Sequence, residues 1–237
     1  MSKKNDLKPW QVEQWVIPPG HDAEFVCRME SVLDVYERPY DPDRPVVCVD
    51  EASTQLIDET RQPVPAQPGQ PARVDYEYKR NGTANLFVAC EPLLGWRILE
   101  ITARRTALDF AAFLKFLADD VYAGVERITL VLDNLNTHKP SVLYQAFAPA
   151  EAHRLANRFE FVYTPKHGSW LNMAELEFAA LRRQCLRRRI GSMSELTAEV
   201  SAWQDERNGR EVVITWQFTT DKARIKLAHL YPQTQPR

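Results

Sequence analysis

Three acidic residues stand where apolar segments end or where a helix is expected to begin. Asp50 follows the apolar run at residues 46–49, and Asp133 follows the run at residues 128–132. Glu175 lies near the expected start of a long helix. Carboxylate oxygens are ligands that Mg²⁺ prefers, and two such ions can catalyse phosphoryl transfer. The pattern therefore predicts a two-metal site.

Each acid also has a plain structural explanation. An exposed acid is common at a strand end and in the first turn of a helix. Taken singly, this explanation is favoured for Glu175 and is evenly balanced for Asp50, but for the three acids together it is disfavoured. Glu51 is the nearest competitor of Asp50, although strand alternation directs it to the other face of the sheet.

Composition sets the class of protein. The chain has 237 residues, of which 44% are hydrophobic, so it can bury one substantial core. The net charge of -2 argues against a uniformly basic DNA-coating protein but allows a local basic patch. The four cysteines form no CxxC pair, which favours neither a zinc site nor a disulfide framework. No apolar segment is typical of a signal peptide or a membrane helix, and we expect a cytoplasmic protein with no membrane partner.

The order of elements predicts an α/β fold, a mixed sheet flanked by helices. We expect strands ending at Asp50 and Asp133, strands at 83–90, 96–102 and 159–163, and helices at 22–36, 107–122, after Pro140 and at 170–190. A proline-rich stretch after Asp50 predicts a surface loop. Residues 1–44 are interpreted as an N-terminal arm or linker, 45–208 as the catalytic domain and 209–237 as a C-terminal extension.

On a helical wheel, the expected helix at 170–190 has one apolar face with an acid on each flank. At about 100° per residue, its core face comprises Leu171, Ala174, Phe178, Leu181 and Cys185. Glu175 and Glu177 lie about 80° from the centre of that face, on opposite flanks. Periodicity therefore does not choose between these two acids.

Basic residues gather near the proposed site. Residues 178–191 contain five arginines and no acid, and the wheel places Arg182 and Arg189 near the line of Glu175. A DNA-backbone role is favoured over a solvated helix face. The full set of candidate DNA contacts is Lys79, Arg80, His138, Lys166, His167, Arg182, Arg183 and Arg189. For the lysines and histidines, a surface or loop residue with no ligand is an open alternative.

Three sequence blocks carry a family resemblance. They are CVDE at residues 48–51, VLDNLNTH at 131–138 and TPKHGSWLNMAE at 164–175. In this order they resemble the DDE-type transposases of bacterial insertion sequences in the mariner superfamily. Segments 76–83 and 216–220 are also similar to family segments, and the likeness spans residues 8–232.

The resemblance implies a ribonuclease-H-like fold and a set of catalytic and metal-binding acids. Carried over by position, these are Asp50, Asp133 and Glu175. The family pattern Asn-x-x-Glu matches Asn172 to Glu175, which leaves Glu177 as a non-ligand. The implied cofactor is Mg²⁺ or Mn²⁺, as two ions, with Asp50 in the bridging role.

The implied function is metal-dependent DNA cleavage and strand transfer during transposition of an insertion sequence. The implied partner is double-stranded DNA, both element ends and target, and a homodimer on DNA is compatible with the family. Too few residues precede Asp50 for a helix-turn-helix module, so we expect a separate N-terminal half. Residues 148–157 are expected to be extra helical material. The alternatives are a ribonuclease-H-like nuclease without strand transfer and a catalytically idle regulator that binds DNA or a transposase.

Overall fold

A single five-stranded mixed sheet organises the chain. The computed structural model describes residues 17–18, 20–135 and 138–232; the predictions for residues 1–16, for 136–137 of the second motif block and for 233–237 lie outside this range. The spatial order of strands is β3-β2-β1-β4-β5. β1 is antiparallel to β2 and parallel to β4, while β2 and β3 are antiparallel and β4 and β5 are parallel. The strands are β1 (Val46–Glu59), β2 (Tyr78–Glu91), β3 (Trp96–Thr102), β4 (Ile128–Leu132) and β5 (Phe159–Tyr163).

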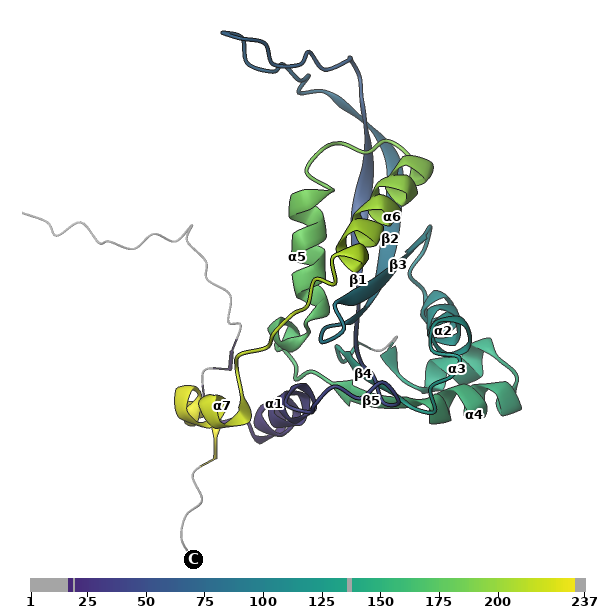
Figure 1. Ribbon diagram of the computed structural model, residues 1–237, viewed down its shortest axis with the longest axis vertical. Coiled ribbons are helices and arrows are strands. Elements are labelled where there is room, and N and C mark those ends of the chain that lie inside the picture. Colours follow the sequence, from purple (N-terminus) through teal and green to yellow (C-terminus); the bar gives the residue numbers. More distant parts are fainter. Residues whose placement is uncertain (1–16, 19, 136–137, 233–237) are drawn as a thin grey trace, which may run out of the picture.

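Helices cover both faces of this sheet (Figure 1). They are α1 (Ala23–Tyr36), α2 (Ala107–Phe116), α3 (Ser141–Ala146), α4 (Pro149–Arg158), α5 (Ala174–Gln184), α6 (Met193–Gly209) and α7 (Thr220–Lys226). Strand alternation divides the core, because Val47 and Val49 pack with α2, α3 and α4, whereas Cys48 packs with α1, α5 and α6. The predicted mixed sheet flanked by helices is confirmed. None of the described helices is both long and apolar enough to cross a membrane.

β1 continues well beyond Asp50, and the prediction of a strand ending there was wrong. Parallel pairing with β4 reaches Cys48 opposite Val131, but antiparallel pairing with β2 continues to Glu59 opposite Tyr78. This outer part of β1 and β2 is an arm that projects from the body (Figure 1), so its residues need no continuous apolar run. The predicted proline-rich surface loop forms the exposed tip of the arm at residues 60–77.

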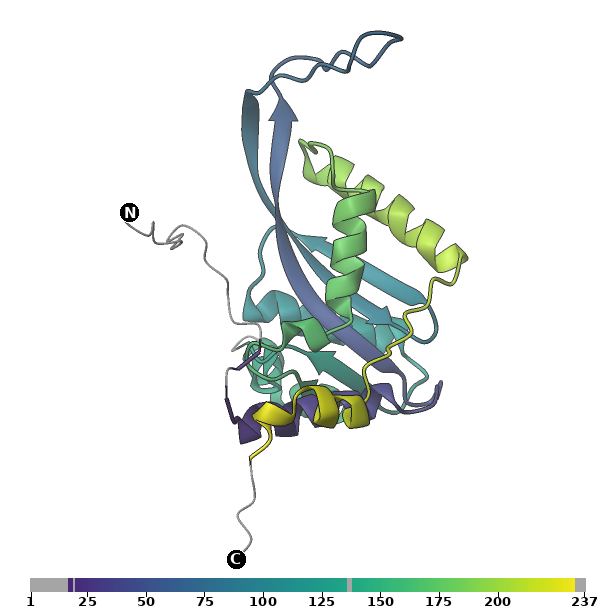
Figure 2. The same ribbon diagram turned by 90° about the vertical axis from the view of Figure 1, so that its left-hand side faces the viewer.

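The segment expected to be a lead-in arm is part of the core. Asp22 caps the start of α1, because its carboxylate accepts a hydrogen bond from the N–H of Phe25 at 2.9 Å. The buried residues of α1 belong to the same apolar cluster as α5. α7, in the expected C-terminal extension, lies alongside α1 (Figure 2), and Arg224 donates to Glu30 at 2.9 Å.

The helix predicted at 170–190 is shorter than expected, and it is followed by a further helix that was not predicted. A 3₁₀ turn at Ser169–Leu171 precedes α5, and the chain leaves the helix after Gln184. Residues 190 and 191 then accept hydrogen bonds from the arm, with Ile57 N–H donating to the Ile190 carbonyl at 2.8 Å. α6 follows, and the signals for it were a Ser192 cap and the buried residues Leu196, Val200 and Trp203 at helical spacing.

Candidate active site

Asp50 lies within β1, just beyond the point where its parallel pairing with β4 ends, and Asp133 directly follows the last residue of β4. Cys48 on β1 stands opposite Val131 on β4, and each acid comes two residues later in its own segment. Neighbouring strands are about 4.8 Å apart. The register therefore brings the two carboxylates close together, although they are 83 positions apart in the chain.

Glu175 is delivered to these acids by a fixed helix start. The Asn172 side chain, 1% exposed, donates from Nδ2 to the Val49 carbonyl at 2.9 Å and accepts from the N–H of Ala174 at 3.1 Å. The Tyr36 hydroxyl donates to the carbonyl of residue 171 at 2.7 Å. Asn172 thus joins the first turn of α5 to the residue before Asp50, and its motif spacing with Glu175 was the only sequence signal for this role.

Asp50 interacts electrostatically with the carboxylates of Asp133 and Glu175. The pKa of Asp50 is raised from an ordinary 3.8 to about 7. Burial is the largest cause of this rise, and the negative charges of Glu175 and Asp133 add to it. The N–H of Glu51, which donates to Asp50 at 2.8 Å, and the charge of His138 act in the opposite direction. The structure thus brings all three predicted acids into one site.

Glu177 belongs to a different environment. Its side chain is 1% exposed and lies 3.4 Å from the guanidinium of Arg97, which is also 1% exposed. Arg207 approaches the same carboxylate at 3.1 Å. The carboxylate of Glu177 is therefore committed to two arginines, which resolves the ambiguity that periodicity left between Glu175 and Glu177.

His138 is buried, in contrast to the prediction that it contacts DNA. Its side chain is 1% exposed, its Nδ1 is hydrogen bonded to Asp133 Oδ1, and its Nε2 lies 3.6 Å from Glu51 Oε2. Burial lowers its pKa, but the interactions with Asp133 and Glu51 outweigh this and raise the pKa to about 9. A group enclosed in this way has no surface to offer a phosphate.

A cavity of about 510 Å³ adjoins Asp133. Exposed Lys166 and His167 line it together with Ser169. The loop needs glycine at position 168, because a Cβ there would lie 2.5 Å from Pro165 Cγ. Lys166 and His167 therefore share this cavity with Asp133, whereas Asp50 and Glu175 do not line it.

Comparison with known proteins places the chain in a family. The sequence profile described as DDE superfamily endonuclease matches residues 45–197. The chain belongs to the DDE superfamily endonucleases. The matched segment includes all three acids of the site. Among curated proteins, no sequence matches the chain.

Solved structures show the fold of this DDE endonuclease. The Mos1 transposase paired-end complex with left transposon end is 19% identical, with a TM-score of 0.53, covering 85% of this chain and 62% of that one. The Mos1 strand transfer complex is 16% identical, with a TM-score of 0.59, covering 94% and 67%. The mariner Mos1 paired end complex with Mg is 18% identical, with a TM-score of 0.57 and the same coverage. The likeness establishes the ribonuclease-H-like fold, and the chain spans 62% of the first of these proteins.

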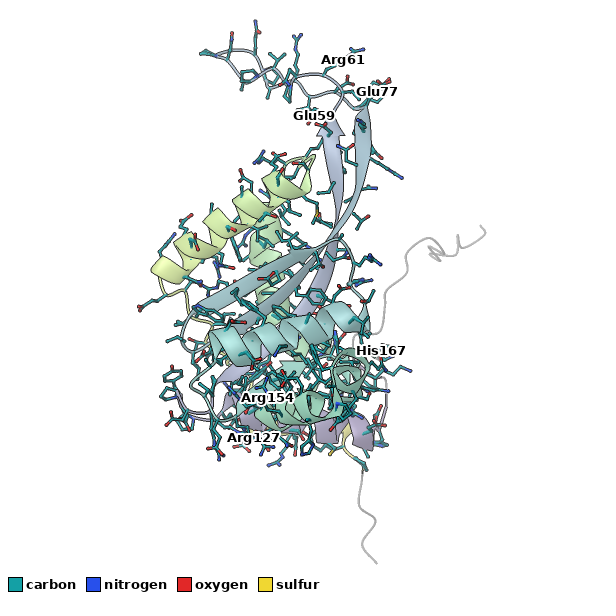
Figure 3. The ribbon with its side chains drawn as sticks, turned by 90° about the vertical axis from the view of Figure 1, so that its right-hand side faces the viewer. Glu59, Arg61, Glu77, Arg127, Arg154 and His167 are labelled. Carbon is teal, nitrogen blue, oxygen red and sulfur yellow. The ribbon has the colours of Figure 1, made fainter. Side chains whose placement is uncertain are left out.

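Arg182 and Arg183 lie on the last turn of α5 in the DDE endonuclease, and both are exposed. Neither side chain has a hydrogen-bond or ion-pair partner among the described residues. Arg189 is different and corrects the helical-wheel prediction, because it lies beyond α5 and donates to Glu59 at 2.6 Å and to the Glu77 carbonyl at 2.9 Å. Figure 3 shows both partners on the projecting arm, far from His167.

Lys79 and Arg80 also lie on the arm rather than beside the acids. Arg80 is paired with Ile57, seven residues along β1 from Asp50. At about 3.4 Å per residue this corresponds to roughly 24 Å. Both basic side chains are exposed, so any DNA contact they make is remote from the acidic site.

The acidic site fits a divalent cation that is completed by substrate. No ready-made cluster of three or more metal-ligating side chains occurs in the part of the chain that the structure describes. Mg²⁺ is usually held by one or two carboxylates together with water and substrate phosphates. Burial is the main cause of the raised pKa of Asp50, and the negative charges of Glu175 and Asp133 add to it, so a cation bound here would favour the ionised carboxylate.

Proposed function

We propose that this chain is the catalytic domain of a DDE transposase. It would cut double-stranded DNA at the ends of an insertion sequence and join the 3′-hydroxyl to target DNA. The observation that carries this proposal is the convergence of Asp50, Asp133 and Glu175 from a strand, the end of a neighbouring strand and a helix start. The fold shared with Mos1 transposase, whose structures include a strand transfer complex, supports it.

The same three acids would hold Mg²⁺ or Mn²⁺, as two ions with Asp50 shared between them. Related Mos1 complexes contain Mn and Mg. Such ions activate an attacking hydroxyl and stabilise the leaving oxygen. Asn172 fixes Glu175 relative to β1, and the sheet register fixes Asp50 relative to Asp133, so the backbone positions of the three acids are set by the fold, and their side chains would close around the ions.

The DNA would approach across the opening beside Asp133. Lys166 and His167 line that opening, and Arg182 and Arg183 extend the positive surface along α5. Residues 45–208 would form the catalytic domain, flanked by residues 1–44 and 209–237. A homodimer on DNA and a separate helix-turn-helix half that recognises the element ends complete the proposal. The chain would act in the cytoplasm.

The decisive experiment is Mn²⁺-dependent nicking of supercoiled plasmid by the full chain beside Asp133→Asn. We expect nicking by the unaltered chain and none by the variant. Nicking that survives in Asp133→Asn would contradict the assignment of the site. Labelled oligonucleotides with an exposed 3′-hydroxyl then separate the alternatives, because a transposase gives joined products and a simple nuclease gives only hydrolysis.

The DNA surface is tested by the salt dependence of binding. Each phosphate contact adds about one to the slope of log K against log salt concentration. Arg182→Ala and Arg183→Ala together should reduce this slope by about one to two. Arg189→Ala is the matched control and should leave the slope unchanged, because Glu59 already engages its guanidinium. An equal effect of all three changes would contradict the proposed surface.

A further inference from the structure

His138 joins two carboxylates that come from different places in the chain. Its Nδ1 is bonded to Asp133 and its Nε2 faces Glu51 at 3.6 Å. The ring packs against Phe110 with 4.5 Å between centroids, and its backbone carbonyl accepts a hydrogen bond from the Tyr163 hydroxyl at 2.9 Å. Asp133 and Phe110 thus fix the imidazole, whereas Nε2 is buried with no hydrogen-bond partner among the described residues and has the Glu51 carboxylate as its ion-pair neighbour.

Asp50 and Glu51 place carboxylates on opposite faces of β1. Asp50 and Glu51 are consecutive on β1, so their side chains point to opposite faces. Asp50 faces the carboxylate of Glu175, whereas Glu51, with its side chain 7% exposed, faces His138. The face of β1 opposite the proposed metal site therefore carries an acid that is connected to Asp133 through the histidine.

Asp133 needs such support more than Asp50 does. Asp50 lies within β1 and is held by strand pairing on the β2 side, but Asp133 has already left β4 and its side chain is 26% exposed. The hydrogen bond between His138 Nδ1 and Asp133 Oδ1 restricts the rotation of this carboxylate. Groups that orient metal ligands from behind typically contribute strongly to metal affinity.

We infer that His138 and Glu51 are positioning residues for Asp133, with His138 orienting the carboxylate and Glu51 orienting His138. The inference rests on the proposed function, because it assumes that Asp133 is a metal ligand. It assigns to both residues a role in divalent-cation binding that does not involve contact with DNA.

The test measures Mn²⁺ affinity of the full chain by titration calorimetry, without DNA. His138→Gln should weaken binding by about 10- to 100-fold, and Glu51→Gln should weaken it by less, on the order of several-fold. Because Glu51 acts through His138, the double variant should bind Mn²⁺ no more weakly than His138→Gln alone. Glu51→Gln keeps the imidazole and the side-chain volume, so it tests the inference even where His138→Gln does not fold.

Two controls separate positioning from general damage to the core. Glu91→Gln makes the same change at a buried acid that accepts a hydrogen bond from Tyr122, four residues along β2 from the strand partner of Glu51, and should not alter Mn²⁺ affinity. Arg105→Gln removes the other ion-pair partner of Glu51, a half-exposed arginine, and should also leave affinity unchanged. An equal loss of affinity in Glu91→Gln and Glu51→Gln would overturn the inference.

Asp133→Asn distinguishes this inference from the proposed function. Loss of Mn²⁺ binding in Asp133→Asn with retention in folded His138→Gln would overturn the positioning role alone. Unchanged Mn²⁺ binding in Asp133→Asn would instead overturn the metal site, and the positioning role with it. Loss in both, with Glu51→Gln intermediate, is the expected result.

Discussion

Glu175 and Glu177 lie two residues apart in the first turn of α5 and have opposite surroundings. Glu177 is buried between Arg97 and Arg207, so its charge is matched within the protein. Glu175 lies near Asp50, and its negative charge adds to the crowding of acids there. Glu177 joins α5 to β3 and α6 through its two arginines. Glu175 instead lies where negative charge has no matching cation among the described residues.

This difference shows how a folded chain separates structural acids from candidate catalytic ones. A buried acid with matched cations has its charge satisfied within the protein. An acid grouped with other acids raises the free energy of the metal-free protein unless a proton or a cation is present. Removing the Glu177 carboxylate should therefore destabilise the metal-free protein. Removing a carboxylate of the Asp50 site should instead reduce the stabilisation that a bound metal ion provides.

The largest expected effect is at Glu177. Glu177→Ala should destabilise the metal-free protein by about 3–5 kcal/mol, because it leaves the guanidinium of Arg97 buried without a carboxylate. Urea unfolding at neutral pH measures this change. Glu175→Ala, on the same helix turn, is the matched control, and equal losses in the two variants would remove the distinction between the regions.

The next effect is a pH dependence produced by Asp50. Its folded pKa of about 7 lies above its ordinary 3.8, so the folded protein binds this proton more tightly than the unfolded chain does. The stability that protonation provides should be complete below pH 3.8 and should be lost as pH rises through about 7. Asp50→Asn should remove this component, making the variant more stable than the unaltered chain by about 2–4 kcal/mol at pH 8.

The measurement for Asp50 is the difference in unfolding free energy between the two proteins from pH 4 to 8 without metal. Subtraction cancels the contribution of the other titrating groups. A difference that stays constant across this range would show that the acids are too far apart, or too well solvated, to interact as described.

Divalent cations should then stabilise the crowded region. At a hundredfold excess over Kd, Mn²⁺ should raise the unfolding free energy by about 2.7 kcal/mol, and chelation should reverse the gain. Thermal unfolding with and without Mn²⁺ measures this effect. Arg189→Ala, in the loop that contacts the arm, should retain the gain, and a gain that persists in Asp50→Asn would place the cation elsewhere.

The smallest effect is expected for Glu175 in the absence of metal. Glu175→Gln should change the stability of the metal-free protein by no more than about 1 kcal/mol, since no arginine depends on it in the way that Arg97 depends on Glu177. The same variant should lose much of the Mn²⁺ stabilisation. A large destabilisation without metal would mean that Glu175 is a structural acid like Glu177.

Elements with strong local signals were predictable from the sequence. The apolar runs before Asp50 and Asp133 gave two strands, and helical spacing gave α2, including its π-helical last turn at Leu117–Val121. The outer part of β1 was missed because its polar residues are stabilised by pairing with β2 rather than by burial. The end of α5 was placed too late because the arm, distant in sequence, binds the backbone of the following loop.

The sequence alone determined which acids were candidates, because their types and their order along the chain are local information. It also determined the class of fold, since apolar periodicity is set by neighbouring residues. Only the tertiary structure decided that Glu177 is matched by Arg97 and Arg207, that His138 is enclosed between Asp133 and Glu51, and that Arg189 binds the arm. The physical reason is that the charge and burial of a side chain depend on partners that the fold brings from distant positions.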